Sequence, residues 1–227
     1  MDQLTERLVE YAQFLSYEDL PPEVVERTKR LILDTVGCAL GAAPWQAPSV
    51  ARALAADVQS RTPATVMVGG QQTSPDMAAF ANGVMTRYLD YNDYCYTNGS
   101  GHPSDTIAPV LAAVEAARGD GKSVILGTVM AYDMLLGLSD SAAHGVSRGW
   151  GSASFQVIAA AVLGHRQAAR DRDSRRTRGD AAACKSVVQG QREKQGQEST
   201  RAGAGGRESP KPRARRMNRS RWTSWRE

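Results

Sequence analysis

The C-terminal part of the chain lacks the residues that build a protein core. Residues 166–227 contain no Leu, Ile, Phe or Tyr. Their only large apolar residues are Val187, Val188, Met217, Trp222 and Trp225. Such a segment cannot bury enough apolar surface to offset the entropy that its backbone loses on ordering. We therefore expect residues 166–227 to be disordered and residues 1–165 to form the folded domain.

Acidic residues become scarce at the same place in the chain. Residues 166–227 carry 18 Lys and Arg against 7 Asp and Glu, whereas residues 1–165 carry 10 against 17. A basic tail with two tryptophans could neutralise phosphates and bind nucleic acid. Its bias toward Arg, Ala, Gly, Ser and Pro is also what out-of-frame translation of a GC-rich gene would give. Because the bias begins abruptly within a helical pattern, we favour this truncated-frame interpretation.

Cysteines are few and long apolar runs are missing. Cys38, Cys95 and Cys184 are odd in number, far apart and never paired as CxxC, so they fit neither a disulfide framework nor a zinc site. No run reaches the roughly 18 apolar residues that a membrane span needs, and the opening MDQLTERLVEY has no apolar signal core. Neither glycine pattern that cradles phosphates is present. These observations predict a cytoplasmic protein without a membrane segment.

Apolar residues recur at helical spacing through most of residues 1–165. The pattern predicts helices over residues 3–15, 22–41, 48–58, 75–88, 107–114, 124–138 and 155–163. Residues 64–68 have the composition of a strand, Gly69-Gly70 of a tight turn, and residues 71–73 of a return strand. Ser104 or Thr106 is expected to cap the helix that follows. The predicted fold class is mainly α, a multi-helix bundle with one small β-hairpin, followed by a disordered basic tail.

The periodicity also predicts which residues face the core. In the helix over 48–58 these are Val50, Leu54 and Val58. The expected inner face of residues 22–41 ends at Leu40, and that of residues 75–88 includes Phe80, Met85 and Tyr88. The later helices are apolar over more than a third of their surface, so we expect part of the bundle to be covered by a partner or by a missing part of the fold.

One polar stretch lies between two apolar helices, residues 88–105 with the sequence YLDYNDYCYTNGSGHPSD. Asp90 and Asp93 lie three apart, and His102 follows Asp90 by twelve residues. An aspartate can abstract a proton next to a carboxylate, or orient a histidine that protonates a leaving hydroxyl. The alternative is purely local: Asp90 bonds nearby backbone, Asp93 is solvated, and His102-Pro103 turns the chain. The spacing alone leaves both interpretations open.

Other chemistry is conceivable in the same stretch. Asp90, Asp93, His102 and Asp105 could hold Mg²⁺ or Mn²⁺, although no DxDxDG or HExxH pattern supports this. Cys95 has no basic neighbour and is interpreted as a bystander thiol. The tyrosines are expected to pack at the base of the loop; they are Tyr88, Tyr91, Tyr94 and Tyr96. In a second glycine-containing loop, His144 and Arg148 could bind a substrate carboxylate or could simply be exposed.

The stretch ANGVMTRYLDYNDYCYTNGSGHPSDTIAPVLAAVEA resembles the MmgE/PrpD family, and within it the 2-methylcitrate dehydratase branch. That family has a pattern like NG…LDFND…GHPSD leading into an apolar helix. Here the pattern stands at Asn82-Gly83, at residues 89–93 and at residues 101–105. The segments PPEVVERTKRLILDTVGCALGA and ATVMVGGQQTSPDMAAFANG also look like the family's opening helices and hairpin. The step from Asp90 to His102, with Asn92 in place of Asp, favours the dehydratase branch over the cis-aconitate decarboxylase branch.

The resemblance implies a carbon–oxygen lyase that uses no metal, iron–sulfur cluster or other cofactor. It implies a large helical domain and a smaller α+β lid, usually in a homodimer, acting on tricarboxylates. The implied reaction eliminates water from 2-methylcitrate to give 2-methylaconitate in propionate breakdown. Asp90 and His102 match active-site positions of the family and are the candidate catalytic residues. The candidate substrate-binding residues are Asp93, Tyr94, Arg87 and Arg148.

This sequence departs from the family pattern in three ways. Tyr94 stands where many relatives have Thr, and Gly151 stands where decarboxylase-like relatives often carry His. The rest of the helical domain and the lid would follow residue 165, where the basic tail stands instead. A tricarboxylate needs several cationic partners, so we expect this chain by itself to be inactive or nearly so. The alternatives are another family activity on a polycarboxylate, decarboxylation or epimerisation, and a helical binding protein whose tail contacts nucleic acid.

Overall fold

The computed structural model describes residues 11–96 and 101–141. Residues 11–14 are helical. The further elements are the 3₁₀ segment η1 (Tyr17–Asp19), the helices α2 (Pro22–Ala42) and α3 (Gln46–Ala56), the strands β1 (Ala64–Thr65) and β2 (Gln72–Thr73), the helix α4 (Pro75–Tyr88), the 3₁₀ segment η2 (Pro103–Thr106), and the helices α5 (Ile107–Ala116) and α6 (Gly121–Ser141). The predicted fold class, mainly α with one small hairpin, is confirmed for these residues. The expected helix over 155–163 and the basic tail over 166–227 lie outside them.

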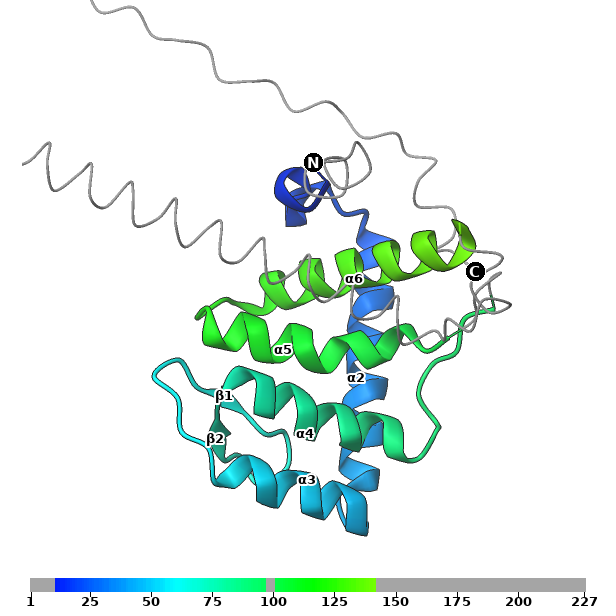
Figure 1. Ribbon diagram of the computed structural model, residues 1–227. Coiled ribbons are helices and arrows are strands. Elements are labelled where there is room, and N and C mark those ends of the chain that lie inside the picture. The colour runs from blue at the N-terminus through cyan, green and yellow to red at the C-terminus, as the bar shows by residue number, and fades with distance from the viewer. Residues whose placement is uncertain (1–10, 97–100, 142–227) are drawn as a thin grey trace, which may run out of the picture. The chain divides into compact units, whose positions relative to one another are not determined.

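The helices form a stack that one long helix crosses. Figure 1 shows α3, α4, α5 and α6 lying one above another, with α2 running behind them. α4 packs against both α3 and α5, and α2 packs against α4, α6 and η2. Because α4 and α5 are neighbours in the stack, the chain that leaves α4 must turn back within residues 89–106 to start α5. The polar stretch picked out in the sequence is this turn.

Local signals explain where α6 and α5 begin. Asp120 accepts hydrogen bonds from the backbone nitrogen of Ser123 (2.9 Å) and from its hydroxyl (2.8 Å), which caps the first turn of α6. At α5 the N-cap residue is Thr106, whose side chain makes no capping bond, and the Ser104 hydroxyl accepts a hydrogen bond from Asn92. The Thr106 hydroxyl donates instead to the Pro103 carbonyl (2.6 Å), because η2 already leads the chain into the helix.

The largest cluster of buried apolar side chains lies where α2, α5 and α6 meet. Its fully buried side chains include Leu15, Val24, Ile107, Val129 and Met130. In α6 the stretch Gly121–Ser139 is long and apolar enough to cross a membrane by length and composition, although it contains Lys122 and Asp133 and so is not an unbroken apolar run. A buried core helix meets the same criterion, and Val129 and Met130 are buried within the bundle.

The inward face of α3 differs from the prediction. Val50 and Leu54 are each 52% exposed, whereas Pro48, Ala51 and Ala55 are buried. Two small alanines allow the α3 backbone to approach α4 closely, and this close approach turns the larger side chains outward. The prediction failed because it ranked apolar residues by size, while the packed face consists of small ones.

In α4, as in α3, large apolar side chains that were predicted to face the core are exposed. Phe80 is 47% exposed and Tyr88 is 40% exposed, although both were expected to face inward. The buried residues of α4 are Ala78, Ala81, Asn82, Met85 and Thr86. In α2, Leu40 is likewise 57% exposed, and the buried face ends at Ala39 and Ala42.

The hairpin is shorter than predicted because α4 replaces part of the strand pairing. β1 and β2 are antiparallel, with Ala64 opposite Thr73. Val66 still donates to the Gln71 carbonyl (2.9 Å), the chain then turns, and the backbone nitrogen of Met67 donates to Oδ1 of Asn82 (2.8 Å). Nδ2 of Asn82 donates to the Thr65 carbonyl (3.0 Å). One buried asparagine on α4 thus satisfies two backbone groups of the hairpin.

α2 is close to the end of α4 at one glycine. A Cβ added at Gly41 would lie 3.2 Å from Cδ1 of Leu89, whereas one added at Gly37 would meet nothing within 4 Å. The sequence predicted either close packing or a helix stop near Gly41. Both occur, because α2 ends at Ala42 and Gly41 lies against Leu89, the residue before Asp90.

Candidate active site

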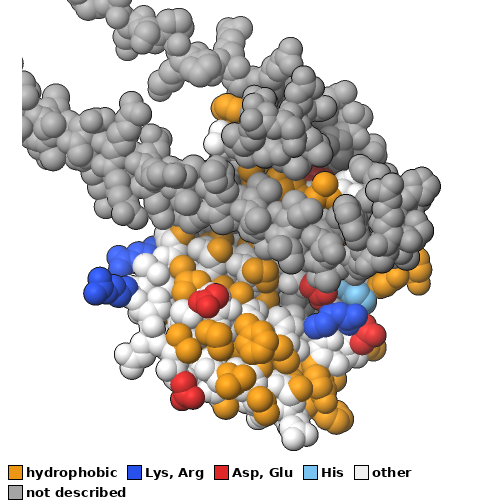
Figure 2. All heavy atoms as spheres, viewed as in Figure 1, with side chains coloured by type: hydrophobic (Ala, Val, Ile, Leu, Met, Phe, Trp, Pro, Cys, Tyr) orange, Lys and Arg blue, Asp and Glu red, His pale blue; other side chains and the backbone are white. Residues whose placement is uncertain are grey.

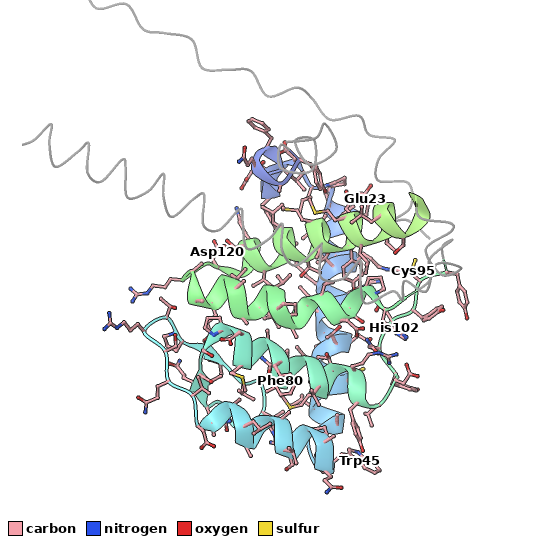
Figure 3. All side chains as sticks on the ribbon, viewed as in Figure 1. Glu23, Trp45, Phe80, Cys95, His102 and Asp120 are labelled. Carbon is pink, nitrogen blue, oxygen red and sulfur yellow. The ribbon has the colours of Figure 1, made fainter. Side chains whose placement is uncertain are left out.

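The candidate site lies at the end of the stack where α4 ends and α5 begins. In Figure 3, His102 lies at this end, and Asp120 lies at the opposite end of α5. The C-terminus of α4 supplies Arg87, the connecting segment supplies residues 90–95 and 101–102, and η2 supplies Ser104 and Asp105. The bundle therefore fixes both ends of the polar stretch on packed helices.

Asp90 has an unusual backbone conformation. Its φ is +50°, in the left-handed region, and its nitrogen donates to the Arg87 carbonyl (3.0 Å) just after α4 ends. Glycine is the usual residue at this position of a helix C-terminus because a Cβ is strained there. The Asp90 side chain, 70% exposed, pairs with the Arg87 guanidinium. This hydrogen bond and the charge of Arg87 lower the pKa of Asp90 below its ordinary value.

His102 lies between the two predicted aspartates. Its Nδ1 lies 2.7 Å from the backbone carbonyl oxygen of Asp93, and its Nε2 lies 3.6 Å from Oδ1 of Asp90. A carbonyl oxygen only accepts hydrogen bonds, so Nδ1 carries a proton and the lone pair of the neutral ring is on Nε2. The ring is mostly buried and meets the Tyr94 ring edge-on, with centroids 4.9 Å apart. The proton-accepting atom of His102 thus faces Asp90.

Asp93 binds to the protein through each of its three oxygens. Oδ2 accepts a hydrogen bond from the Tyr132 hydroxyl (2.8 Å), and Oδ1 accepts one from the backbone nitrogen of Ser104 (3.0 Å). Its carbonyl oxygen accepts a hydrogen bond from Nδ1 of His102. Asp93 therefore joins α6, η2 and the histidine. Its predicted contact with substrate stays a prediction.

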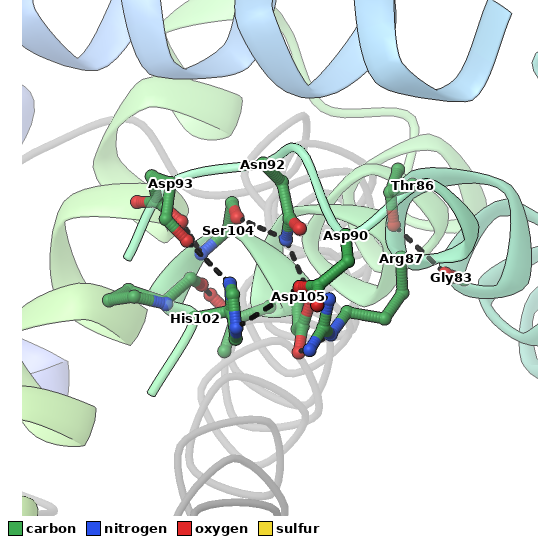
Figure 4. A network of polar contacts seen from close by, with 11 residues as sticks. Gly83, Thr86, Arg87, Asp90, Asn92, Asp93, His102, Ser104 and Asp105 are labelled. Atoms are coloured by element: carbon green, nitrogen blue, oxygen red, sulfur yellow. Dashed lines mark hydrogen bonds and ion pairs between the residues drawn. The ribbon is translucent and has the colours of Figure 1, made fainter. Parts of the chain in front are cut away.

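A second set of bonds links η2 to α4 (Figure 4). Nδ2 of Asn92, which is 6% exposed, donates to the Ser104 hydroxyl (2.8 Å) and to Oδ1 of Asp105 (2.9 Å). The orientation of the amide follows from the chemistry, because only its nitrogen can donate to a carboxylate. Oδ2 of Asp105 lies 3.6 Å from Nε of Arg87. Arg87 is thus placed between Asp90 and Asp105.

The cluster has more negative than positive groups. Three carboxylates, those of Asp90, Asp93 and Asp105, surround one guanidinium and one imidazole. The Arg87 charge is shared between two aspartates, so it is only partly available to a substrate carboxylate. Any further cation for a polycarboxylate must come from outside this set of residues. His144 and Arg148, which were predicted for this purpose, lie outside the described residues.

The other chemical interpretations are less well supported by the geometry. Within residues 11–96 and 101–141, no group of three His, Cys, Asp or Glu side chains could hold a metal ion. The carboxylates of Asp93 and Asp105 turn toward Tyr132 and Asn92 instead of converging. Cys95 is partly buried, and burial followed by the charge of Asp93 raises the pKa of its thiol, so it is a poor nucleophile.

Two of the tyrosines lie elsewhere than predicted. Tyr91 and Tyr96 are 82% and 87% exposed, so they do not pack at the base of the loop. Asn92, next to Tyr91, turns inward and bonds to Ser104 and Asp105, while Tyr91 itself points outward. Tyr94 contacts His102, and Tyr88 contacts the Trp45 ring at a centroid distance of 5.8 Å.

Sequence reasoning missed Tyr132 and the inward role of Ser104. The helix over 124–138 was interpreted as a broadly apolar helix, and Tyr132 was not singled out. A signal was present, because Tyr132-Asp133 is a polar pair inside an otherwise apolar run. Tyr132 is 4% exposed, and a buried tyrosine hydroxyl normally needs a hydrogen-bond partner. Asp93 is that partner.

An apolar groove lies apart from the cluster, between α3 and α4. It measures about 430 Å³ and is lined chiefly by Val50, Leu54, Phe80, Val84 and Tyr88. Figure 2 shows apolar side chains gathered on this face. The large apolar residues that were predicted to face the core, Val50, Leu54 and Phe80, line this groove instead. It offers no charged group for acid–base chemistry.

Comparison with known proteins is consistent with the motifs. The family model of the MmgE/PrpD N-terminal domain matches residues 6–196. A cis-aconitate decarboxylase-like protein of Aspergillus oryzae is 28% identical over 161 residues, covering 66% of this chain and 33% of the relative. The cis-aconitate decarboxylase of Aspergillus terreus is 30% identical over 139 residues, covering 57% and 28%. The 2-methylcitrate dehydratase of Salmonella typhimurium is 30% identical over 144 residues, covering 56% and 28%. The chain thus spans about a third or less of the length of these relatives.

Proposed function

This chain belongs to the MmgE/PrpD family, and we propose that its polar cluster is the proton-transferring side of a lyase site for a tricarboxylate. The substrate class that we propose is 2-methylcitrate or a close analogue, from which water is eliminated. The names of the relatives support this class, since they include 2-methylcitrate dehydratases and cis-aconitate decarboxylases. The proposal assigns His102 and Asp90 to the chemistry.

The conformation of Asp90 is the observation that carries the proposal. A glycine would fit the left-handed backbone without strain, yet this position holds a carboxylate. The carboxylate is directed at Arg87 and lies 3.6 Å from Nε2 of His102. Strained, charged residues cluster at functional sites because the surrounding structure maintains them for their chemistry. We infer that Asp90 is retained for its charge.

The lowered pKa of Asp90 and its pairing with Arg87 favour one of its two candidate roles. A general base works best when its pKa lies near the working pH. Arg87 lowers the pKa of Asp90, which makes this carboxylate a weak base. We therefore assign Asp90 to orienting His102 and to stabilising its protonated form. Nε2 of His102 is the atom that moves the proton.

The proposed reaction is a β-elimination. A proton leaves the carbon next to a carboxylate, a hydroxyl leaves the neighbouring carbon, and the two depart as one water while a C=C bond forms. The neutral His102 can accept a proton at Nε2, and the protonated ring can donate from the same atom. Because Asp93 holds Nδ1, both transfers use a single nitrogen in a fixed direction. No cofactor takes part in the proposal.

Turnover should be slow with the residues that the cluster supplies. A tricarboxylate carries three negative charges, whereas the charge of Arg87 is already shared between Asp90 and Asp105, and Asp90 also lies beside His102. Charge-assisted pairs are the main means of binding carboxylates. Arg148 is one candidate for a further cation. The predictions of a homodimer and of a cytoplasmic location accompany the proposal as expectations.

Product analysis tests the reaction class. The protein, in excess over substrate, is incubated separately with 2-methylcitrate and with cis-aconitate, and the products are identified by NMR. We expect a new alkene from 2-methylcitrate and no loss of CO₂ from cis-aconitate. Decarboxylation of cis-aconitate without dehydration of 2-methylcitrate would assign the chain to the other branch. The step from Asp90 to His102 and the presence of Asn92 support the dehydratase branch.

A further inference from the structure

We propose that Tyr132 is a positioning residue, which holds Asp93 so that the Asp93 carbonyl fixes the proton of His102 on Nδ1. The inference rests on the proposed function, because it concerns the histidine that we assign to proton transfer. It adds a residue from α6, far from the sequence motif, to the machinery of the site.

The contacts form one short chain. The Tyr132 hydroxyl donates to Oδ2 of Asp93 (2.8 Å), and the Asp93 carbonyl oxygen accepts from Nδ1 of His102 (2.7 Å). The backbone nitrogen of Ser104 binds the other carboxylate oxygen of Asp93 (3.0 Å). The side chain of Asp93 is therefore held on two sides, and this sets the direction of its backbone carbonyl.

Tyr132 is suited to be the fixed end of this chain. It is 4% exposed and belongs to the large core cluster, with Met130 and Leu135 buried on the same helix. Its environment keeps the hydroxyl protonated, because burial and the neighbouring Asp93 charge raise the pKa of Tyr132 well above its ordinary value. Because the core holds the ring in place, the protonated hydroxyl donates its hydrogen bond from a fixed position. The remainder of the loop, by contrast, includes the exposed Tyr91 and Tyr96.

The consequence for His102 is specific. The hydrogen bond made by one ring nitrogen determines which nitrogen of a neutral histidine carries the proton. With the Asp93 carbonyl in place, Nδ1 is protonated and Nε2 faces Asp90 at 3.6 Å. If Tyr132 no longer held Asp93, the carbonyl could turn, and the ring would exchange between its two neutral forms.

The test is a measurement of the His102 tautomer by ¹⁵N NMR in the full chain, which needs no substrate. The chain has three histidines, and a His102→Gln variant assigns the signal. In the wild type we expect the Nδ1–H form to dominate. In Tyr132→Phe, which removes only the hydroxyl, we expect the signal to shift toward the Nε2–H form.

The same helix offers a matched control. The Tyr11 hydroxyl donates to Oδ2 of Asp133 (2.7 Å), so Tyr11→Phe also removes a tyrosine–aspartate bond to α6. That bond involves neither Asp93 nor His102. We expect Tyr11→Phe to leave the His102 tautomer unchanged, even if both variants lose similar stability.

The outcomes separate this inference from the proposed function. A shift in Tyr132→Phe with none in Tyr11→Phe supports it, and an unchanged tautomer in Tyr132→Phe, or equal shifts in both, overturns it. If Tyr132→Phe does not fold, Asp93→Asn decides. An amide has one accepting oxygen, so it cannot serve both Tyr132 and Ser104, and the same shift is expected; its absence overturns the inference. A failed dehydration assay would reject the proposed function and leave this tautomer result standing.

Discussion

Nε2 of His102 lies 3.6 Å from Oδ1 of Asp90. The two residues are twelve positions apart, and the turn between α4 and η2 brings them together. The Asp93 carbonyl holds the far side of the imidazole, and Arg87 holds the carboxylate. Each member of the pair thus has its own fixed partner, as a preorganised proton-transfer site requires.

The backbone at Asp90 predicts an unusual mutational result. Asp90→Gly and Asp90→Ala both remove the carboxylate, so their difference isolates the left-handed backbone. We expect the glycine variant to be more stable than the alanine variant by about 1 kcal/mol, because alanine keeps the strained Cβ. Urea unfolding of the two variants measures this difference. Equal stabilities would contradict the assigned conformation.

Arg87 should control the ionisation of Asp90. Because the pKa of Asp90 is lowered in the folded chain, the pair stabilises the fold above the unfolded-state pKa and loses this contribution as the pH falls through the folded-state pKa. In Arg87→Gln we expect the pKa of Asp90 to rise toward its ordinary value, as measured by ¹³C carboxyl titration. Lys29→Gln, which removes a cation paired with Glu26 on α2, is the control and should leave the Asp90 titration unchanged.

Asn82 belongs to the family motif, but its contacts are structural. Replacing it with alanine leaves the Met67 nitrogen and the Thr65 carbonyl without their partner. We expect a loss of about 2–3 kcal/mol, since buried backbone groups without partners are destabilising. Asn82→Asp should lose at least as much, because it buries a carboxylate whose second oxygen faces the Thr65 carbonyl, where a donor is needed. Thermal unfolding ranks the stabilities of the variants. A wild-type-like Tm for Asn82→Ala would refute the role of Asn82 in holding the hairpin backbone.

The two glycines of α2 form a matched pair. Gly37→Ala should stabilise the chain by about 1 kcal/mol, because alanine favours the helix and its Cβ meets no other atom within 4 Å. Gly41→Ala gains the same propensity but brings its Cβ to 3.2 Å from Leu89. We expect a smaller gain or a net loss there, together with a changed NMR signal for Asp90. Denaturant unfolding compares the two, and an equal gain in both would show that Leu89 moves aside freely.

The sequence predicted the elements well and their inward faces poorly. Helix starts at Pro22 and Pro75 followed from proline and acidic residues in the first turn, and these are local properties. The packed faces of α3 and α4 depend on how closely two helices approach, which Ala51 and Ala81 determine by their small size. That distance is a property of the pair of helices, so periodicity in one helix does not reveal it.

In the candidate site, too, the sequence predicted the local features but not the contacts between distant segments. The stretch containing Asp90 and His102 was visible as polar residues between apolar helices, and the structure brings these two together. The link from Tyr132 to Asp93 spans 39 positions and depends on the placement of α6 against η2. Local patterns do not encode such a contact, although a tyrosine beside an aspartate in an apolar helix was a usable hint.

Single-turnover dehydration of 2-methylcitrate is the most direct test of the proton-transfer pair. Wild type, Asp90→Asn and His102→Gln are each used in excess over substrate, with Asp120→Asn, at the far end of α5, as the control. We expect slow conversion by the wild type and the control, and a loss of about 100-fold or more in the two site variants, the range of general acid–base catalysis. Conversion at equal rates in all four proteins would contradict the assignment of His102 and Asp90.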